Sequence, residues 1–205
     1  MVSEILKIFD ELYPFDGKCF LNYETPWQLL FATILSAQCT DACVNFVTQN
    51  LFEEFPTLED FSAAEISQIE AAVKQTGFFR VKAKYLQDAA RKLLHEHNGE
   101  VPREISELTA FGGVGRKTAN VVRGHIFEIP SIVVDTHVKR VSGRLGLARA
   151  TDPVKIEFEL MKILPEENWI AFNQQAITHG RKICKSQKPL CSQCELRTFC
   201  MFFSD

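Results

Sequence analysis

Four cysteines near the C-terminus are the residues with the clearest chemical potential. They form the pattern C-x6-C-x2-C-x5-C over Cys184, Cys191, Cys194 and Cys200. Cysteine thiolates are soft metal ligands, so a group this tight predicts a metal centre rather than four unrelated thiols. Zinc modules usually contain two close pairs of ligands separated by a longer loop, whereas intermediate gaps suit a four-cysteine iron–sulfur cluster. The spacing favours the iron–sulfur cluster and leaves structural zinc as the alternative.

The second segment that could take part in chemistry is a glycine-rich turn at 112–115, with the sequence Gly-Gly-Val-Gly. Pro102 and Gly112 mark the start and the end of a helix that we expect over 102–111. A second helix is expected over 116–127. Such a helix–hairpin–helix lets backbone N–H groups at a helix N-terminus approach a phosphate closely. A nucleotide P-loop would need a preceding strand and a glycine directly before the lysine, and this segment has neither. A plain turn between two helices and a passive DNA clamp are the alternative interpretations of this segment.

Lys117 and Asp135 are the candidate catalytic pair. Lys117 falls in the first turn of the second hairpin helix, where the helix dipole and Arg116 disfavour a further positive charge, as an amine nucleophile requires. Asp135 follows the extended run Ile132-Val133-Val134 and is expected to cap the next helix. A phosphate-pairing lysine and a purely structural cap are the simpler interpretations. Together the two residues suit an amine that attacks a sugar carbon beside a carboxylate that stabilises a cationic transition state.

The elements that carry these residues are nearly all helical by pattern. Thr25-Pro26 provides a cap and a first-turn proline, Ser62-x-x-Glu65 fits a capping box, and Gly77 is expected to end a helix. The only strand-like run is 132–134, which has no hairpin partner and is expected to be an extended connection. The sequence therefore predicts an all-α protein.

Bulk properties exclude some partners and leave a polyanion open. The chain has 205 residues, 46% of them hydrophobic, and no apolar run long enough to cross a bilayer. The first residues lack the layout of a secretory signal, so we expect an intracellular protein with reduced or metal-bound cysteines. The net charge is −3, but basic residues are concentrated in 116–149 and 181–200. These two segments predict a positive face that the total charge conceals.

The combined motifs resemble the endonuclease III family, bifunctional DNA glycosylases of the helix–hairpin–helix superfamily. The resemblance covers almost the whole chain through LSAQCTD at 35–41, GGVGRKTANVV at 112–122, VDTHVKRV at 134–141, HGR at 179–181 and the cysteine pattern. It implies an all-α fold of two helical domains flanking a DNA-binding cleft. One would be a six-helix barrel at 21–130 that includes the helix–hairpin–helix at 102–127. The other would be a [4Fe–4S] cluster domain formed by 1–20 plus 131–205.

The resemblance also implies roles for individual residues. Lys117 matches the family's catalytic lysine, Asp135 its catalytic aspartate, and the four cysteines its cluster ligands. Gln38 matches the glutamine that fills the gap left in the duplex, and the family's leucine wedge falls at Phe78. The usual LPGVG hairpin is here Phe111-Gly112-Gly113-Val114-Gly115, a departure that removes a proline. The residues expected to contact DNA are Gln38, Phe78, Gly113, Val114, Gly115, Arg116, His137, Lys185 and Lys188.

The implied reaction begins with the damaged base turned out of the DNA stack, because its C1′ atom is unreachable inside a duplex. Lys117 would attack C1′, Asp135 would support departure of the base, and β-elimination from a Schiff base would break the strand. The implied partner is double-stranded DNA with oxidised pyrimidines or abasic sites. The protein would act as a monomer, away from membranes, in the cytoplasm at the nucleoid.

Three rival functions remain at this stage. The related adenine glycosylases lack the lysine nucleophile and carry a catalytic glutamate where this chain has Thr33. A non-catalytic helix–hairpin–helix protein would tolerate loss of Lys117. An iron–sulfur electron carrier would not need a hairpin with basic flanks.

Overall fold

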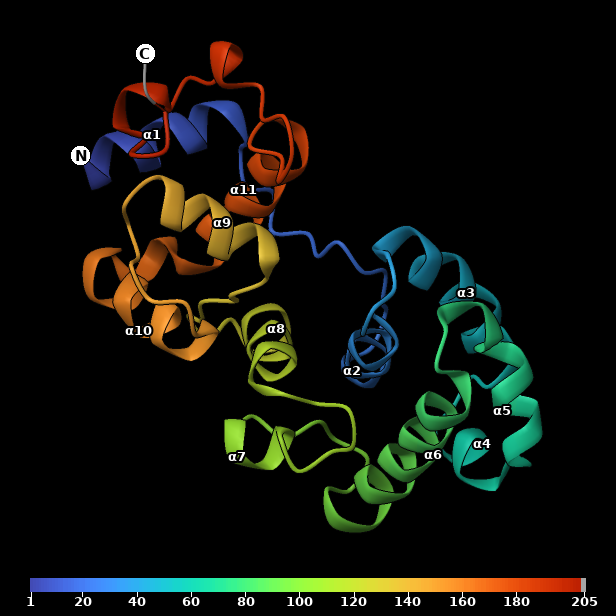
Figure 1. The fold of residues 1–205 in the computed structure, drawn as a ribbon. Helices are drawn as coiled ribbons and strands as arrows, with labels where there is room; N and C mark the ends of the chain where they lie inside the picture. The colour runs from blue at the N-terminus through green and yellow to red at the C-terminus, as the bar shows by residue number, and fades with distance from the viewer. Residues whose placement is uncertain (204–205) are drawn as a thin grey trace. The chain divides into compact units, whose positions relative to one another are not determined.

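The computed structural model describes residues 1–203, and these fold into helices joined by irregular connections, with no strand among them (Figure 1). The expected all-α class is confirmed. The chain divides into two compact units. One is the continuous segment Cys19–Glu128, and the other combines Met1–Lys18 with the chain from Ile129 onward.

The continuous unit is organised around one central helix. Its elements are α2 (Pro26–Leu35), α3 (Asp41–Glu54), α4 (Leu58–Ala63), α5 (Ile66–Ala72), the short 3-10 helix η1 (Lys74–Thr76), α6 (Phe79–Glu96), α7 (Ile105–Leu108) and α8 (Arg116–Ile126). Helix α2 packs against α3, α6 and α8, and every side chain from Gln28 to Leu35 is buried. A helix that is apolar on all sides belongs in the core, and α3, α6 and α8 cover it. Figure 1 shows α2 between α8 and α3.

The helix caps agree with one expectation and contradict another. Thr25 caps α2 as expected, and Gln28 completes a capping box with it. The capping box expected at Ser62-x-x-Glu65 is wrong, because α4 runs to Ala63 and a new helix begins after Glu65. The four-residue box of α5 instead pairs Glu65 with Gln68.

The first hairpin helix is shorter than the expected 102–111. Helix α7 spans only Ile105–Leu108. The amides of Ala110 and Phe111 donate to carbonyls three residues back rather than four. Such tightened bonds do not propagate an α-helix, so the chain has already become a turn before Gly112.

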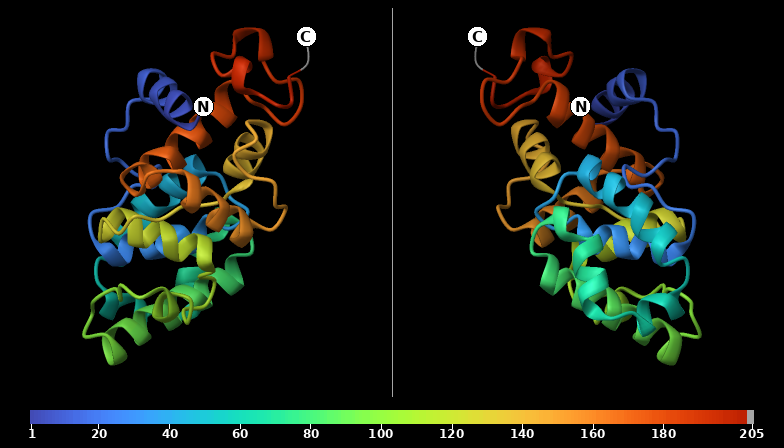
Figure 2. Two further views of the ribbon diagram at one scale, coloured as in Figure 1. Left: turned by 90° about the vertical axis from the view of Figure 1, so that its left-hand side faces the viewer. Right: turned by 90° about the vertical axis from the view of Figure 1, so that its right-hand side faces the viewer.

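The second unit brings the two ends of the described chain together. It contains α1 (Val2–Leu12), α9 (Thr136–Arg144), α10 (Pro153–Ile163), η2 (Glu166–Asn168), α11 (Trp169–Lys182), η3 (Cys191–Gln193) and η4 (Arg197–Phe199). Helix α11 packs against both α1 and α9, and Figure 2 shows α1 beside α11 from two sides. The rings of Phe9 and Phe172 meet edge to face at 5.9 Å. Among the described residues, every helix is too short or too polar to span a lipid bilayer.

Candidate active site and metal centre

The glycine hairpin packs directly on a ring of α6. A Cβ atom added at Gly112 would collide with the ring of Tyr85, and one added at Gly113 would lie 2.8 Å from the Cδ2 atom of that ring. Gly113 also has a φ of 78°, which side chains rarely adopt. Val114 is buried and anchors the turn. The hairpin backbone is therefore held in place while Gly112, Gly113 and Gly115 remain exposed.

Lys117 lies in the first turn of α8, directly after this hairpin. Its side chain is exposed, and it makes no hydrogen bond or ion pair with any residue that the structure describes. The next residues inward, Ala119 and Asn120, are buried and fix the helix against the core. The amine is therefore free to engage a ligand from a rigid base.

Asp135 is held by its own helix and leaves one oxygen unused. The run Ile132-Val133-Val134 is extended, as expected, and it is also buried. Val133 N–H donates to Asn173 Oδ1 of α11 at 2.9 Å. Oδ1 of Asp135 accepts from the amides of His137 at 2.8 Å and Val138 at 2.7 Å, so the expected N-cap is confirmed. Among residues 1–203, nothing donates a hydrogen bond to Oδ2. The carboxylate is thus oriented by one oxygen and available through the other.

His137 lies in the contact between α9 and α11. Its Nδ1 is 3.1 Å from a terminal nitrogen of Arg140. Burial lowers the pKa of His137, the carboxylate of Asp135 opposes that shift, and the guanidinium groups of Arg140 and Arg181 reinforce it. A Cβ atom at Gly180 would lie 2.9 Å from His137 Nδ1 and 3.0 Å from His137 Cβ. The glycine of the HGR motif therefore permits the close packing that fixes the helix behind Asp135.

Gln38 and Phe78 occupy exposed turns of the continuous unit. Both are non-glycine residues in the left-handed region, with φ of 53° and 48°. Such conformations are uncommon and concentrate at functional sites. Phe78 precedes α6 and is 66% exposed, whereas its neighbour Phe79 packs against the core. The Phe-Phe pair is thus split between surface and interior.

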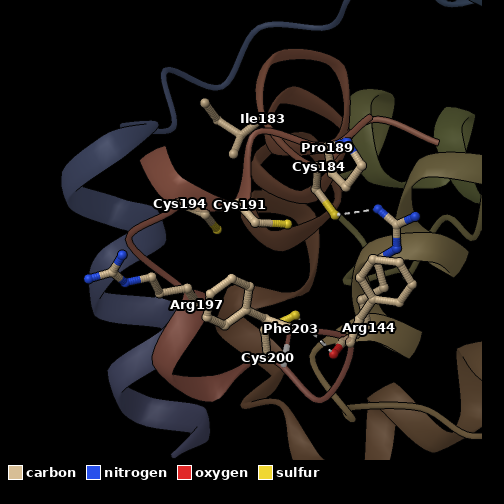
Figure 3. A pocket seen from close by; sticks show the side chains of 10 residues that line it. Arg144, Ile183, Cys184, Pro189, Cys191, Cys194, Arg197, Cys200 and Phe203 are labelled. Carbon is tan, nitrogen blue, oxygen red and sulfur yellow. Dashed lines mark hydrogen bonds between the residues drawn. The ribbon is translucent and has the colours of Figure 1, made fainter. Parts of the chain in front are cut away.

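The four cysteines surround a single pocket, shown in Figure 3. Ile183, Pro189 and Arg197 complete much of its wall. Burial raises the pKa of Cys194, and the nearby thiols of the other three cysteines raise it further. The sequence pattern therefore corresponds to one site in space.

Two arginines of α9 hold the chain around this pocket, and Arg144 also lines it. Arg140 Nε donates to the carbonyl of Cys184 at 2.8 Å. Arg144 donates to Cys184 Sγ at 3.3 Å and to the carbonyl of Lys185 at 2.8 Å. In the sequence both arginines belong to the basic segment 116–149, which predicts a positive surface and no contact with the cysteines. Their i, i+4 spacing on one helix was the available signal that they act together.

The cysteine loop presents cations outward while the arginines hold its backbone. Lys185 and Lys188 are both exposed, and Lys188 has a φ of 48°. The amide of Leu190 donates to the carbonyl of Ile183 at 3.0 Å and closes the loop. Positive side chains are therefore displayed on a loop of defined shape.

The donor set of this pocket consists of thiols, which are soft metal ligands. Four thiols line the pocket, yet within residues 1–203 no three His, Cys, Asp or Glu side chains converge closely enough to hold one metal ion. A zinc ion would need four sulfur atoms at about 2.3 Å from a common point. Four thiol side chains are likewise the donor set that a four-cysteine iron–sulfur cluster uses.

A buried histidine contacts the same site. His179 Nε2 lies 3.6 Å from Cys194 Sγ, and its Nδ1 is 3.1 Å from the hydroxyl of Tyr13 in α1. Burial lowers the pKa of His179 to about 4, so the ring is neutral near pH 7. The N-terminal helix is thereby linked to the cysteine pocket.

Comparisons with known proteins agree with this geometry. The family model of HhH-GPD superfamily base excision DNA repair proteins matches residues 31–166. The chain is 51% identical to Endonuclease III of Synechocystis sp. over 97% of this chain and 90% of that protein. It is 42% identical to Endonuclease III of Bacillus subtilis over 93% of this chain and 87% of that protein.

Solved structures give the same result. A non-covalent Endonuclease III–DNA complex superposes with a TM-score of 0.92 at 43% identity, covering 98% of this chain and 94% of the other. A trapped Endonuclease III–DNA covalent intermediate matches with the same TM-score and identity, over 98% and 96% of the two chains. The fold and the hairpin are those of an HhH-GPD base excision repair protein. Within that superfamily, the chain belongs to the endonuclease III family.

Proposed function

We propose that this protein is a base-excision-repair DNA glycosylase that removes oxidised pyrimidines and cleaves the resulting abasic site through a Schiff base on Lys117. The observation that carries the proposal is the exposed, unpaired amine of Lys117 at the helix start behind the glycine hairpin. A similar protein, 43% identical, has been trapped as a covalent intermediate with DNA.

The chemistry follows from the two catalytic side chains. The neutral amine of Lys117 attacks C1′ of the sugar, and the bond to the damaged base breaks with its electrons leaving on the base. The free Oδ2 of Asp135 stabilises the positive charge that develops on the sugar. Opening of the sugar ring gives the imine, loss of a C2′ proton follows, and the C3′–O bond breaks to cut the strand. Hydrolysis of the imine frees Lys117.

The DNA contacts of the proposal are mostly to phosphate. The exposed backbone at Gly113 and Gly115, with Val114 as anchor, would hold one phosphate at the start of α8, assisted by Arg116. Lys185 and Lys188 would pair with phosphate from the cysteine loop. These contacts carry no sequence information, which suits an enzyme that must find damage anywhere. His137 would contribute as a neutral hydrogen-bonding group.

Cys184, Cys191, Cys194 and Cys200 would hold a [4Fe–4S] cluster. When bound, the cluster supplies iron–thiolate bonds that cross-link the loop carrying Lys185 and Lys188. The excision steps use Lys117 and Asp135 and need no electron transfer. We further propose that the protein acts as a monomer on duplex DNA in the cytoplasm, at the nucleoid.

The monofunctional adenine-type alternative has a specific observation against it. That reaction would need a carboxylate where this chain has Thr33, and Thr33 is buried with its hydroxyl donating to the carbonyl of Leu30 at 2.7 Å. A hydroxyl bound to its own helix cannot act as the missing acid.

Borohydride trapping tests the proposed function. Incubation with duplex DNA containing one abasic site, in the presence of borohydride, should give a stable one-to-one covalent product, because reduction fixes the imine. A protein that excises thymine glycol but gives no covalent product would be monofunctional. One that binds this DNA and neither excises nor forms the product would be a passive clamp.

The metal content provides a second prediction. Protein purified without oxygen should be brown and contain iron and acid-labile sulfide in equal amounts, and Cys194→Ser should lower both. Chelation of the iron should weaken binding to undamaged duplex, because the loop with Lys185 and Lys188 would lose its cross-links. Colourless protein with one zinc ion per chain would refute the cluster.

Phe78→Ala is the third prediction. Stacking of an aromatic side chain on a base contributes about 1–3 kcal/mol, so affinity for a thymine glycol duplex should fall by about tenfold or more. The melting temperature should hardly change, because Phe78 is mostly exposed. Phe79→Ala is the matched control and should lower the melting temperature, because Phe79 packs on the core. Unchanged affinity with a large fall in melting temperature for Phe78→Ala would assign the ring to the core.

A further inference from the structure

Lys82 is a buried cation that takes no part in the proposed catalytic steps. It lies in the first turn of α6 and is 3% exposed. Its Nζ donates to the carbonyl of Leu35 at 2.8 Å and to the carbonyl of Thr76 at 2.7 Å. No carboxylate of the described residues pairs with it. Burial lowers the pKa of Lys82, and the nearby thiols of Cys39 and Cys43 oppose that shift.

The two carbonyl groups explain why a cation is stable there. Leu35 is the last residue of α2 and Thr76 the last residue of η1. The final carbonyls of a helix have no partner within the helix, and the negative end of the helix dipole favours a positive charge. An apolar side chain at 82 could fill the same space but would leave both carbonyls unpaired. The lysine therefore joins two helix ends that have no direct bond to each other.

Each of these helix ends leads into one of the two exposed left-handed turns. Gln38 follows Leu35 by three residues, and Phe78 follows Thr76 by two. The amide of Cys39 donates to the carbonyl of Ser36 and closes the first turn. Cys43 Sγ lies 3.5 Å from the carbonyl of Gln75 and ties the start of α3 to the second turn. Both turns are thus fixed to the same small cluster of groups, with Lys82 at its centre.

We propose that Lys82 is a positioning residue that sets the separation of Gln38 and Phe78, so that both side chains enter the duplex at one lesion. This inference rests on the proposed function, since it assumes that the protein opens the duplex. A functional constellation must be held to within about 0.5 Å by residues whose own geometry is locked. Two bonds from one buried ammonium provide that constraint between segments more than 30 residues apart in the sequence.

The test compares two substrates on Lys82→Met. This side chain has a similar length but cannot donate to either carbonyl. Excision of thymine glycol from duplex DNA should fall by about 10- to 100-fold, because small misplacements of inserting groups have effects of this size. Cleavage of an abasic site in a single-stranded oligonucleotide should stay within about twofold of the parent, because Lys117 and Asp135 act there without a duplex to open.

A matched control separates positioning from loss of stability. Gln87 is also a buried side chain of α6, and its Nε2 donates to the carbonyl of Ala64 at 2.8 Å and to that of Phe61 at 3.4 Å. It therefore joins α6 to another helix end, but that segment carries no exposed left-handed residue. Gln87→Leu should lower the melting temperature as Lys82→Met does and should leave the ratio of the two activities unchanged.

A direct readout of insertion completes the test. With 2-aminopurine beside the lesion, saturating parental protein should raise the fluorescence by unstacking that base. Lys82→Met should give at most about half of the parental rise. If Lys82→Met does not fold, Lys82→Gln is the substitute, because its side chain keeps an N–H donor group. Its duplex excision should fall relative to its single-strand cleavage, but by less than in Lys82→Met.

The outcomes are distinguishable from failure of the proposed function. Parental protein without duplex excision or trapping would refute the proposed function itself. An active parent with equal losses of both activities in Lys82→Met, or with unchanged duplex excision, would overturn the role of Lys82. Loss of duplex excision alone, with a normal ratio for Gln87→Leu, would support it.

Discussion

Lys117→Gln is expected to abolish the borohydride-trapped complex and to lower cleavage of abasic-site DNA by about a thousandfold or more. The amide nitrogen of glutamine cannot form an imine, and no other described amine lies in the first turn behind the glycine hairpin. Binding of abasic-site duplex should weaken by less than about tenfold, because only one positive charge is removed. Gel-resolved trapping and equilibrium binding, measured on the same preparation, provide the comparison.

Lys155→Gln is the matched control for this variant. Lys155 is also an exposed lysine in the first turn of a helix, α10, so its replacement changes the net charge equally. Trapping and cleavage should stay at the parental level. If Lys117→Gln still cleaves abasic-site DNA at the parental rate, the nucleophile is another group and the assignment of Lys117 is wrong.

Asp135→Asn should lower the rate of thymine glycol excision by about 100-fold or more. Loss of one preorganised electrostatic contact to a transition state typically lowers kcat by about that factor. Asparagine is as good an N-cap as aspartate, and its carbonyl oxygen can accept from the amides of His137 and Val138 as Oδ1 does now. The substitution therefore removes the charge of the free oxygen while it keeps the cap. Cleavage of a preformed abasic site should be affected less than excision, because no base has to depart.

Asp152→Asn tests whether the cap alone explains the result. Asp152 caps α10 by accepting from the amide of Lys155 at 3.0 Å. Both asparagine variants should melt close to the parent, and only Asp135→Asn should lose excision. Parental excision by Asp135→Asn would show that the carboxylate serves the fold alone.

The sequence was informative wherever function depends on a short local pattern. The cap at Asp135 and the extended 132–134 run each follow from a few adjacent residues, and the structure has both. The length of the first hairpin helix was not predictable in the same way. Its end depends on whether successive amides bond three or four residues back, which the glycines further along do not specify.

Residues that act over long range were missed for a physical reason. Lys82, Arg140 and Arg144 lie on amphipathic helices, where a charged residue is expected to face solvent. Each donates to at least one main-chain carbonyl 40 or more residues away, and a carbonyl has no sequence signature. The roles of these cations can therefore be assigned only from the structure, which shows which backbone carbonyls they bind.

The use of both chain ends in one unit has a consequence for biosynthesis. Segment Cys19–Glu128 is continuous and can fold as soon as it has emerged from the ribosome, whereas α1 packs on α11, and Tyr13 meets His179 across 166 residues of chain. At 5–20 residues per second, α1 waits about 10–30 s for that partner. During this interval the apolar face formed by Ile5, Leu6 and Phe9 has no helix to cover it. Helix α1 is thus made well before the helix on which it docks, and its apolar face is open to aggregation in the meantime.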